Sequence, residues 1–257
     1  MKIGVRPMSS DAAWQAVYEA ACAPYRGDGG LRHRWAWHRA RGKLAHDPVF
    51  RGLLERGELR AGNRELDIGC GQGQLASLLR ACVAVAARGA WPASWPPAPL
   101  ALEYTGIELM PKDVARANAA LGGLPGATPK AHIVCADLRQ ATLPACDLAV
   151  LLDVLHYVEP GAQDDLLSRV RDALAPGGRL LLRVGDAAQR RGFAYSQWID
   201  RVVCAVRGLR MPRTWGRPLD DWVALLVRLG FSPVRCVTMG PGTPFPNVLL
   251  VAELQTR

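Results

Sequence analysis

Short apolar runs recur along the chain from residue 64 onward, separated by longer segments with helical periodicity. The runs are RELDIG, EYTGIEL, HIVCAD, CDLAVLLDVL, RLLLRVG, SPVRCVTM and NVLLVAEL. Bounded apolar runs of this length indicate strands, and strands that alternate with helices favour a mainly parallel sheet. We therefore predict an α/β fold built on a doubly wound sheet of seven strands.

Helical patterns fill the spaces between most of these strands. GQLASLLRACVAV follows a glycine-rich turn, Pro111 opens PKDVARANAAL, Pro176-Gly177-Gly178 closes AQDDLLSRVRDAL, and Gly230 closes LDDWVALLVRLG. The last two strands are joined only by GPGTPFP, which is too short to hold a crossover helix. We therefore predict that the last strand is antiparallel.

Two helical patterns precede the first strand and predict an N-terminal helical cap. SSDAAWQAVYEAACAPY begins at a Ser10 or Asp11 cap, and its aromatic residues have the spacing of a buried face. LRHRWAWHRARGKLAHDPVFRGLL interleaves aromatic and basic side chains, which suits either a lid over a substrate or a basic surface helix. The predicted organisation is a cap or lid over 1–58 and one larger domain over 59–257, with a surface-loop insertion at 87–102 and a second lid candidate at 189–216.

The composition suits a chain that buries a full core. Of the 257 residues 49% are hydrophobic, and no run approaches the roughly 18 consecutive apolar residues of a membrane helix. The start, MKIGVRPMSSDAAWQ, has no apolar run of the signal-peptide type, so we expect a cytoplasmic protein. The seven cysteines are scattered without a Cys-x-x-Cys pair, which argues against a disulfide framework and against a zinc site.

The net charge of +9 is concentrated in RHRWAWHRARGK (32–43) and RVVCAVRGLRMPRTWGR (201–217). Basic stretches attract nucleic acid, an acidic protein or an anionic substrate, but they also occur as solvated faces. The sequence leaves these alternatives open.

The stretch ELDIGCGQGQLASLL places an acid and three glycines between the first strand and its helix. A strand that ends near Asp67 and continues into Gly69-Cys70-Gly71-Gln72-Gly73 presents backbone N–H groups and a helix N-terminus to a ligand. The third glycine of a dinucleotide fingerprint would stand at position 74, which is Gln74. The turn therefore predicts a nucleotide-type cradle and disfavours NAD.

From residue 60 to 185 the order of these motifs resembles the class I methyltransferases that use S-adenosyl-L-methionine (SAM), and the terminal strand pair agrees. The resemblance implies a Rossmann-like sheet, SAM as the cofactor and S-adenosyl-L-homocysteine (SAH) as the product. On LDIGCGQG it implies that Asp67 and the backbone of Gly69, Cys70, Gly71 and Gly73 hold the methionine moiety.

Acids after the next strands extend the resemblance. Glu108 in YTGIEL, followed by Leu109, looks like the residue that accepts both ribose hydroxyls, a role that suits a carboxylate because it only accepts hydrogen bonds. Glu103 competes for this role, but it falls at the start of its strand. Asp137 and Leu138 in VCADL resemble the adenine-binding position. Open α/β sheets bind ligands at the carboxyl ends of their strands, where these acids lie.

The segment CDLAVLLDVLHYV resembles the fourth strand and the turn under the transferable methyl group, which assigns Leu152 and Asp153 to the cofactor site. His156, three residues past Asp153, is a candidate general base or orienting group, with a structural role in the turn as the alternative. Trp37, Arg41 and Tyr157 are candidate substrate-binding residues. No carboxylate constellation for a metal like that of catechol methyltransferases is present. Strand four also lacks the Asn/Asp-Pro-Pro-Tyr ending that resembles nucleobase and glutamine amino-methyltransferases, which argues against a DNA or RNA amine as the acceptor and leaves O, C and N open as acceptor atoms.

Finally, WHRARGKLAHDPVFRGLL, DIGCGQG, LDVLHYV and TPFPNVLLV together are similar to methyltransferases of bacterial aryl-polyene and related pigment gene clusters. This weaker resemblance implies O- or C-methylation of an aromatic or acyl intermediate of secondary metabolism, either free or held by an acidic acyl carrier protein that would use the basic stretches. The alternatives are an RNA-directed methyltransferase and a SAM-binding partner subunit without activity of its own.

Overall fold

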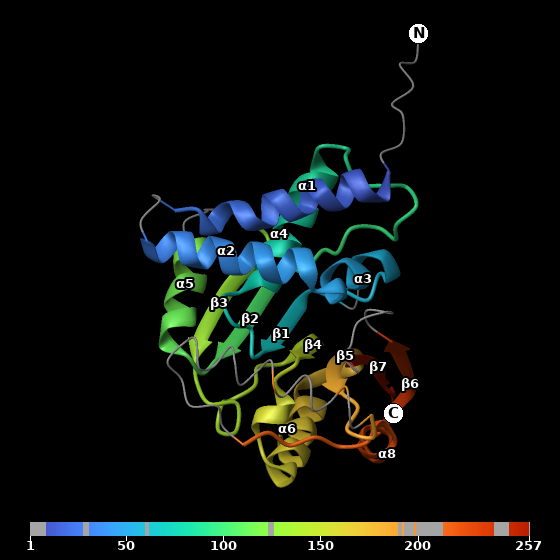
Figure 1. The fold of residues 1–257 in the computed structure, drawn as a ribbon. Coiled ribbons are helices and arrows are strands. Elements are labelled where there is room, and N and C mark those ends of the chain that lie inside the picture. The colour runs from blue at the N-terminus through green and yellow to red at the C-terminus, as the bar shows by residue number, and fades with distance from the viewer. Residues whose placement is uncertain are drawn as a thin grey trace. The chain divides into compact units, whose positions relative to one another are not determined.

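The computed structural model describes residues 9–27, 31–59, 62–122, 126–189, 192, 198, 213–238 and 247–256. Strands and helices alternate along these residues, as the sequence predicts (Figure 1). The strands are β1 (Arg64–Ile68), β2 (Glu103–Glu108), β3 (Lys130–Cys135), β4 (Cys146–Leu152), β5 (Leu174–Gly185), β6 (Phe231–Thr238) and β7 (Asn247–Leu254). The helices are α1 (Ser10–Cys22), α2 (Leu31–His46), α3 (Pro48–Arg56), α4 (Gln74–Ala87), α5 (Pro111–Leu121), α6 (Pro160–Ala173) and α8 (Leu219–Arg228), with short 3₁₀ turns η1 (Ala23–Tyr25) and η2 (Leu155–Tyr157).

The seven strands have the order β3-β2-β1-β4-β5-β7-β6. Strands β1, β2 and β3 pair in parallel, and so do β4 and β5. Strand β7 runs antiparallel to both β5 and β6. The doubly wound α/β fold with an antiparallel last strand is therefore confirmed.

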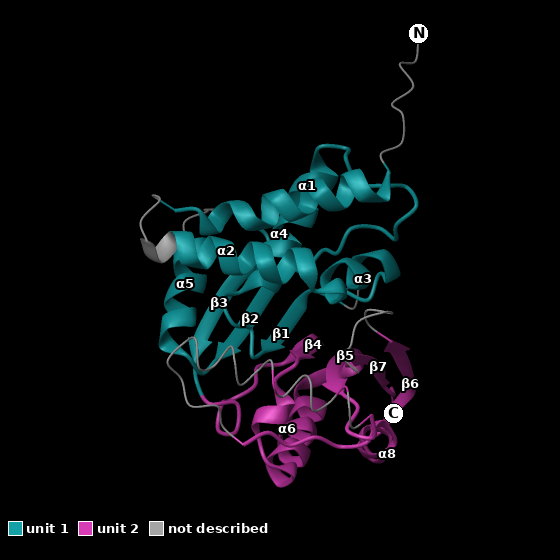
Figure 2. Cartoon of the chain, viewed as in Figure 1, with its two compact units in different colours: residues 1–136 teal, residues 137–257 magenta. Residues whose placement is uncertain are grey.

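The chain divides into two compact units, Met1–Ala136 and Asp137–Arg257 (Figure 2). The first holds α1 to α5 with β1 to β3, and the second holds the remaining strands with α6 and α8. The division of the chain into a cap over 1–58 and a larger domain over 59–257 stays a prediction.

In the first unit, α1 contacts both α2 and α4. Its N-cap is Ser9, whose hydroxyl accepts the Ala12 N–H at 3.3 Å, so the predicted cap at Ser10 or Asp11 was one or two residues late. Val17 and Tyr18 are buried, in agreement with the predicted buried face. The second helical pattern is divided at Asp47, because Pro48 begins α3 and the Asp47 carboxylate accepts the Val49 N–H at 3.1 Å.

The predicted insertion at 87–102 is a loop from Arg88 onward, since α4 extends to Ala87. Trp91 Nε1 donates to the Pro96 carbonyl at 2.8 Å, and the Trp95 ring meets the Trp91 ring edge-on at a centroid distance of 5.3 Å. These contacts within the loop stabilise its conformation.

In the second unit, β5 begins at Leu174, which pairs with Cys146 ahead of a register shift. Helix α6 therefore ends at Ala173, and Pro176-Gly177-Gly178 lies inside the strand rather than closing the helix as predicted. Most of the second lid candidate at 189–216 lies outside the described residues. No helix in the described part of the chain is long and apolar enough to cross a membrane.

Candidate functional site

The glycine-rich turn after β1 is fixed by backbone hydrogen bonds. The N–H groups of Gly69 and Cys70 donate to the Ile107 carbonyl at 2.8 and 3.2 Å, and the Gly73 N–H donates to the Cys70 carbonyl at 2.9 Å. Gly69, Gly71 and Gly73 have φ angles of 81°, 57° and 73°, a region that glycine enters without steric cost. The shape of the turn therefore depends on all three glycines.

Two of these glycines also differ in what surrounds them. A Cβ added at Gly73 would lie 2.7 Å from Leu121 Cδ1, so Gly73 allows α5 to pack against the turn. A Cβ added at Gly71 would meet only Gln74 Oε1, at 3.5 Å. Gly73 is thus needed for packing, whereas Gly71 leaves space beside the turn for a ligand.

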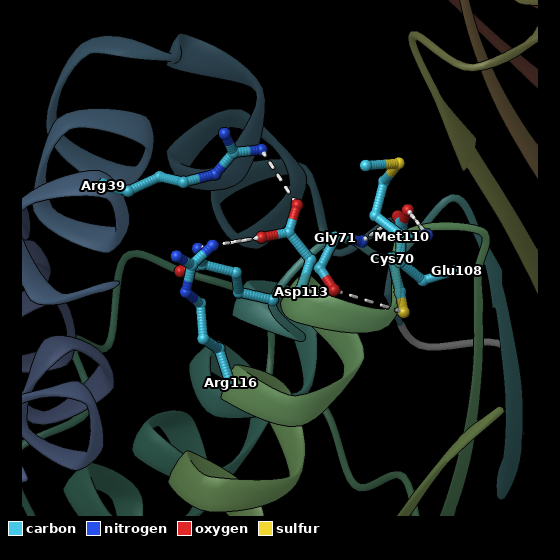
Figure 3. A network of polar contacts seen from close by, with 8 residues as sticks. Arg39, Cys70, Gly71, Glu108, Met110, Asp113 and Arg116 are labelled. Atoms are coloured by element: carbon cyan, nitrogen blue, oxygen red, sulfur yellow. Dashed lines mark hydrogen bonds and ion pairs between the residues drawn. The ribbon is translucent and has the colours of Figure 1, made fainter. Parts of the chain in front are cut away.

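Glu108, the last residue of β2, joins its carboxylate to this turn (Figure 3). Its Oε2 accepts the Gly71 N–H at 2.9 Å, and its Oε1 accepts the Met110 N–H at 2.8 Å. Each carboxylate oxygen can accept a second hydrogen bond, so Glu108 retains capacity for two hydroxyl donors. Leu109, the next residue, is 58% exposed.

Glu103, the competing acid, lies at the other end of β2. It is exposed and stands in register with Arg64, the first residue of β1, whereas the glycine turn follows the last residue of β1. Of the two acids, the structure brings Glu108 to the turn.

Asp67 is buried beneath the turn with 5% of its surface exposed, and the Tyr104 hydroxyl donates to its Oδ2 at 2.5 Å. Burial raises the pKa of Asp67 to about 7, the Tyr104 hydrogen bond and Lys43 lower it, and the Glu108 charge raises it further. A cation bound beside Asp67 would favour its ionised form.

Two buried residues that the sequence analysis missed, Tyr25 and Asp113, contact Gln72 of the turn. The Tyr25 hydroxyl donates to the Gln72 carbonyl at 2.8 Å, and Gln72 Nε2 donates to Asp113 Oδ1 at 3.3 Å. Asp113 also pairs with Arg116 at 2.8 Å and with Arg39 at 3.9 Å (Figure 3). The sequence signals Asp113 only as an acid in the first turn of the predicted helix that Pro111 opens.

Trp37 and Arg41, both predicted to bind substrate, lie together on α2. Trp37 packs against a buried cluster that includes Tyr25 and Ala40. The Arg41 guanidinium lies 4.8 Å from the centre of the Trp37 ring and 5.2 Å from that of Tyr18. Within the basic stretch 32–43, several charges therefore contact neighbours in the same unit, since Arg39 also pairs with Asp113 and Lys43 with Asp47.

In the second unit, Asp137 forms an ion pair with Arg139. Arg139 Nε and Nη2 both donate to the Asp137 carboxylate, at 3.0 and 2.5 Å, and this pairing lowers the pKa of Asp137. The neighbouring Leu138 carbonyl accepts Arg169 Nη2 at 2.8 Å. Asp137 and Leu138, the predicted adenine-binding residues, therefore lie in a loop whose backbone is held by a hydrogen bond from Arg169.

Leu152 ends β4, and Asp153 follows it with a φ of 59°, which is rare for a residue other than glycine. Arg183, buried on β5, donates to Asp153 Oδ1 through Nε at 2.8 Å and to Oδ2 through Nη2. This bidentate ion pair stabilises the unusual conformation at the strand end.

His156 and Tyr157 lie side by side in η2, with ring centroids 4.0 Å apart. Gln163 Nε2 donates to the carbonyls of Leu155 and Val158, at 3.0 Å each, and the Trp215 N–H donates to the His156 carbonyl at 2.8 Å. The turn that carries the candidate base is thus held on both sides.

Among the described residues, no group of three or more His, Cys, Asp or Glu side chains could hold a metal ion. The six cysteines of that part of the chain form no disulfide with one another; they are Cys22, Cys70, Cys82, Cys135, Cys146 and Cys236.

Comparison with known proteins adds to this geometry. The family described as "Methyltransferase domain" matches residues 36–234. The acetylserotonin O-methyltransferase of Rattus norvegicus is 33% identical over 125 residues, which cover 49% of this chain but only 28% of the rat enzyme. The match therefore spans less than a third of that relative's length.

Two solved structures share the fold. An O-methyltransferase family protein from Burkholderia thailandensis has a TM-score of 0.61 at 17% identity, over 90% of this chain and 62% of that one. The magnesium protoporphyrin IX methyltransferase from Synechocystis with bound SAH has a TM-score of 0.56 at 19% identity, over 91% and 93% of the two chains. At these identities the similarity concerns the fold alone.

Proposed function

The chain belongs to the class I S-adenosyl-L-methionine-dependent methyltransferase family, and from this premise we propose that it transfers the methyl group of SAM to an oxygen atom of a small molecule. The observation that carries the proposal is the Glu108 carboxylate hydrogen-bonded to Gly71 at the glycine turn. A carboxylate at a strand end beside open backbone suits a ligand with a vicinal diol and an extended chain.

The described residues of the first unit fit SAM. Glu108 has two acceptor positions left for the ribose hydroxyls, and the space at Gly71 admits a ligand that a Cβ would obstruct. Burial raises the pKa of Asp67 to about 7, and the cationic amino group of the methionine moiety would favour its ionised form. We assign the methionine moiety to Asp67 and to the backbone from Gly69 to Gly73.

The order of motifs assigns the remaining contacts. We propose that Leu109, Asp137 and Leu138 bind the adenine, and that Leu152 and Asp153 form the wall beneath the methyl group. Arg139 lowers the pKa of Asp137 and so favours its ionised carboxylate, which can accept a hydrogen bond from the exocyclic amine of adenine. SAH occupies the same positions after the reaction.

When bound, SAM supplies an electrophilic methyl group on a positively charged sulfur. The protein's own residues then have to align the acceptor in line with that methyl group, exclude water and remove the hydroxyl proton. We assign proton removal, or orientation of the hydroxyl, to His156, because η2 fixes its backbone directly after the end of β4. Tyr157, Trp37 and Arg41 are the proposed acceptor-binding residues.

A phenolic or related hydroxyl is the acceptor that the relatives favour. The rat relative is named an acetylserotonin O-methyltransferase, and the structural neighbour from Burkholderia thailandensis is an O-methyltransferase family protein. Both names agree with an oxygen acceptor, and an aromatic or acyl intermediate of secondary metabolism stays a prediction from the sequence. Delivery by an acidic carrier protein and a cytoplasmic location stay predictions from the sequence.

The test is incubation of the purified protein with methyl-labelled SAM, a panel of small hydroxyaryl compounds, RNA and an acyl carrier protein. We expect label in a small hydroxyaryl product together with an equal amount of SAH. Label in RNA, or SAM binding without transfer to any component, would contradict the proposal and favour the RNA-directed or the non-catalytic alternative.

A further inference from the structure

Gln72, between two of the glycines in the turn, is held through both its backbone and its side chain. Its carbonyl accepts the Tyr25 hydroxyl at 2.8 Å, and its Nε2 donates to Asp113 at 3.3 Å. Tyr25 is 2%, Gln72 0% and Asp113 3% exposed, so this contact is closed to water. Gln72 Oε1 has no hydrogen-bond partner among the described residues, so the Gln72 carbonyl and Nε2 are the groups that hold this residue in one arrangement.

The position of Gln72 makes these contacts matter for the turn. Glycine loses more conformational freedom on ordering than any other residue, and Gln72 lies between Gly71 and Gly73. The Tyr25 hydrogen bond fixes the peptide group between Gln72 and Gly73, and the Asp113 hydrogen bond holds the Gln72 side chain, so both restrict the turn before a ligand arrives. A binding site that is already ordered binds more tightly, because less entropy is lost on binding.

Both contacts connect the turn to the N-terminal helices. Tyr25 belongs to η1, directly after α1, and it packs in a cluster with Ala36 and Ala40 of α2. Asp113 belongs to α5, and its carboxylate is paired with Arg39 of α2 as well as with Arg116 (Figure 3).

The exposed ring of Trp35 reinforces this connection. The guanidinium of Arg116 lies 4.0 Å from the ring centre and that of Arg39 lies 5.4 Å from it. A cation over an indole ring is attracted by the charge distribution of the ring. Helices α2 and α5 are thus joined at the same arginines that pair with Asp113.

We propose that Tyr25 and Asp113 are positioning residues for the cofactor, which link the docking of the N-terminal helices to the shape of the glycine turn. The inference rests on the proposed function, since the turn must be the part of the protein that holds SAM. Linkage between two events is reciprocal: if docked helices favour cofactor binding, then bound cofactor favours docked helices.

The test compares wild-type protein with Tyr25→Phe, Asp113→Asn and the control Tyr18→Phe. Tyr18→Phe removes a hydroxyl from α1 in the same way but leaves the Gln72 contacts in place. Affinity for SAM and SAH is measured by calorimetry, and amide hydrogen exchange of residues 10–46 is measured with and without SAH.

Tyr25→Phe removes one hydrogen bond to the turn, and Asp113→Asn removes the charge that pairs with Arg39 and Arg116. We expect each variant to weaken SAM binding about 3- to 10-fold, and Tyr18→Phe to leave it unchanged. In the wild type, SAH should slow amide exchange in α1 and α2. At saturating SAH, the difference in amide exchange between bound and free protein should be smaller in both test variants than in the wild type. Loss of stability alone would speed exchange in the free and bound proteins without removing this difference.

Equal SAM affinity of Tyr25→Phe and Tyr18→Phe in folded proteins would overturn the inference and leave the proposed function intact. If the two test variants do not fold, the wild-type exchange decides, because unchanged exchange in α1 and α2 on SAH binding overturns the linkage. A wild type that binds neither SAM nor SAH would instead overturn the proposed function.

Discussion

Gly71 combines a backbone requirement with access to a ligand. Its φ is 57°, and a Cβ there would enter the open side of the turn. Gly89 provides a matched control, because its φ is 69° and an added Cβ would meet nothing within 4 Å. The two glycines thus share the conformational demand and differ only in their position relative to the turn.

We predict that Gly71→Ala and Gly89→Ala each lower the free energy of unfolding by about 1 kcal/mol, the cost of a left-handed residue with a Cβ. Only Gly71→Ala should also weaken SAM binding, by at least about tenfold, because its Cβ intrudes where the cofactor is assigned. Calorimetric titration with SAM distinguishes the two. Equal SAM affinity in both variants would remove Gly71 from the cofactor site.

His156 is tested by turnover rather than by binding. A general base acts in the transition state, so His156→Ala should lower kcat about 10²-fold or more while the SAM dissociation constant stays nearly unchanged. The control is His132→Ala, which removes an exposed histidine from β3. Retention of most of the turnover in His156→Ala would assign the residue to the structure of η2.

Individual residues differed in how far the sequence could predict them. Glu108 was separable from Glu103 because the end of a strand is readable from the pattern. The contacts of Trp37 and Arg41 were not, since they depend on how helices pack. Tyr25 and Asp113 meet Gln72 from 47 and 41 residues away, a distance over which a single sequence carries no pairing signal.

At the scale of the element, β1 places two carboxyl groups, Glu65 and Asp67, on one face, both buried. Neither oxygen of Glu65 has a hydrogen-bond partner among the described residues. Burial, reinforced by the Asp67 charge, raises the pKa of Glu65 well above its usual value. The alternation of side chains along a strand makes such pairs unavoidable when acids occupy positions i and i+2 of one face.

The raised pKa predicts how stability depends on pH. Above the unfolded value of about 4.3 the folded state binds more protons than the unfolded state, so the free energy of unfolding falls as the pH rises, by up to about 1.4 kcal/mol per unit for one group. Glu65→Gln cannot lose a proton, so it should match the wild type at about pH 4, below the unfolded pKa, and be more stable at about pH 8. Urea unfolding at both pH values measures the difference.

Glu103→Gln, at the exposed start of the neighbouring strand β2, is the control and should follow the wild type at both pH values. If Glu65→Gln loses stability between the two pH values as steeply as the wild type does, burial of Glu65 does not cause the pH dependence.

Element boundaries were the part of the fold that the pattern predicted least well. The strand-to-helix alternation identified all seven strands, because each carries a bounded apolar run. The start of β5 was misplaced because Leu174 pairs with Cys146 across a register shift, and such pairing overrides the turn preference of Pro176-Gly177-Gly178. The cap is Ser9 rather than Ser10, and because both residues are serine the residue type could not distinguish them.

At the scale of the whole molecule, topology follows from connection lengths. A seven-residue link such as GPGTPFP cannot carry a crossover helix, so the antiparallel placement of the last strand was predictable. The net charge of +9 was less informative, since Arg39, Arg41 and Lys43 contact side chains of their own unit. Total charge does not reveal which cations are already paired.

The measurement that tests the central claim most directly is calorimetric titration with SAM and SAH of the wild type and of two variants of one strand, Glu108→Ala and Glu103→Ala. Glu108 ends β2 beside the glycine turn, and Glu103 begins it. We predict one SAM bound per wild-type chain, about a 100-fold or larger loss of affinity in Glu108→Ala because two charge-assisted hydrogen bonds are lost, and unchanged affinity in Glu103→Ala. The account is contradicted if the wild type binds no SAM, or if Glu108→Ala binds SAM as tightly as Glu103→Ala does.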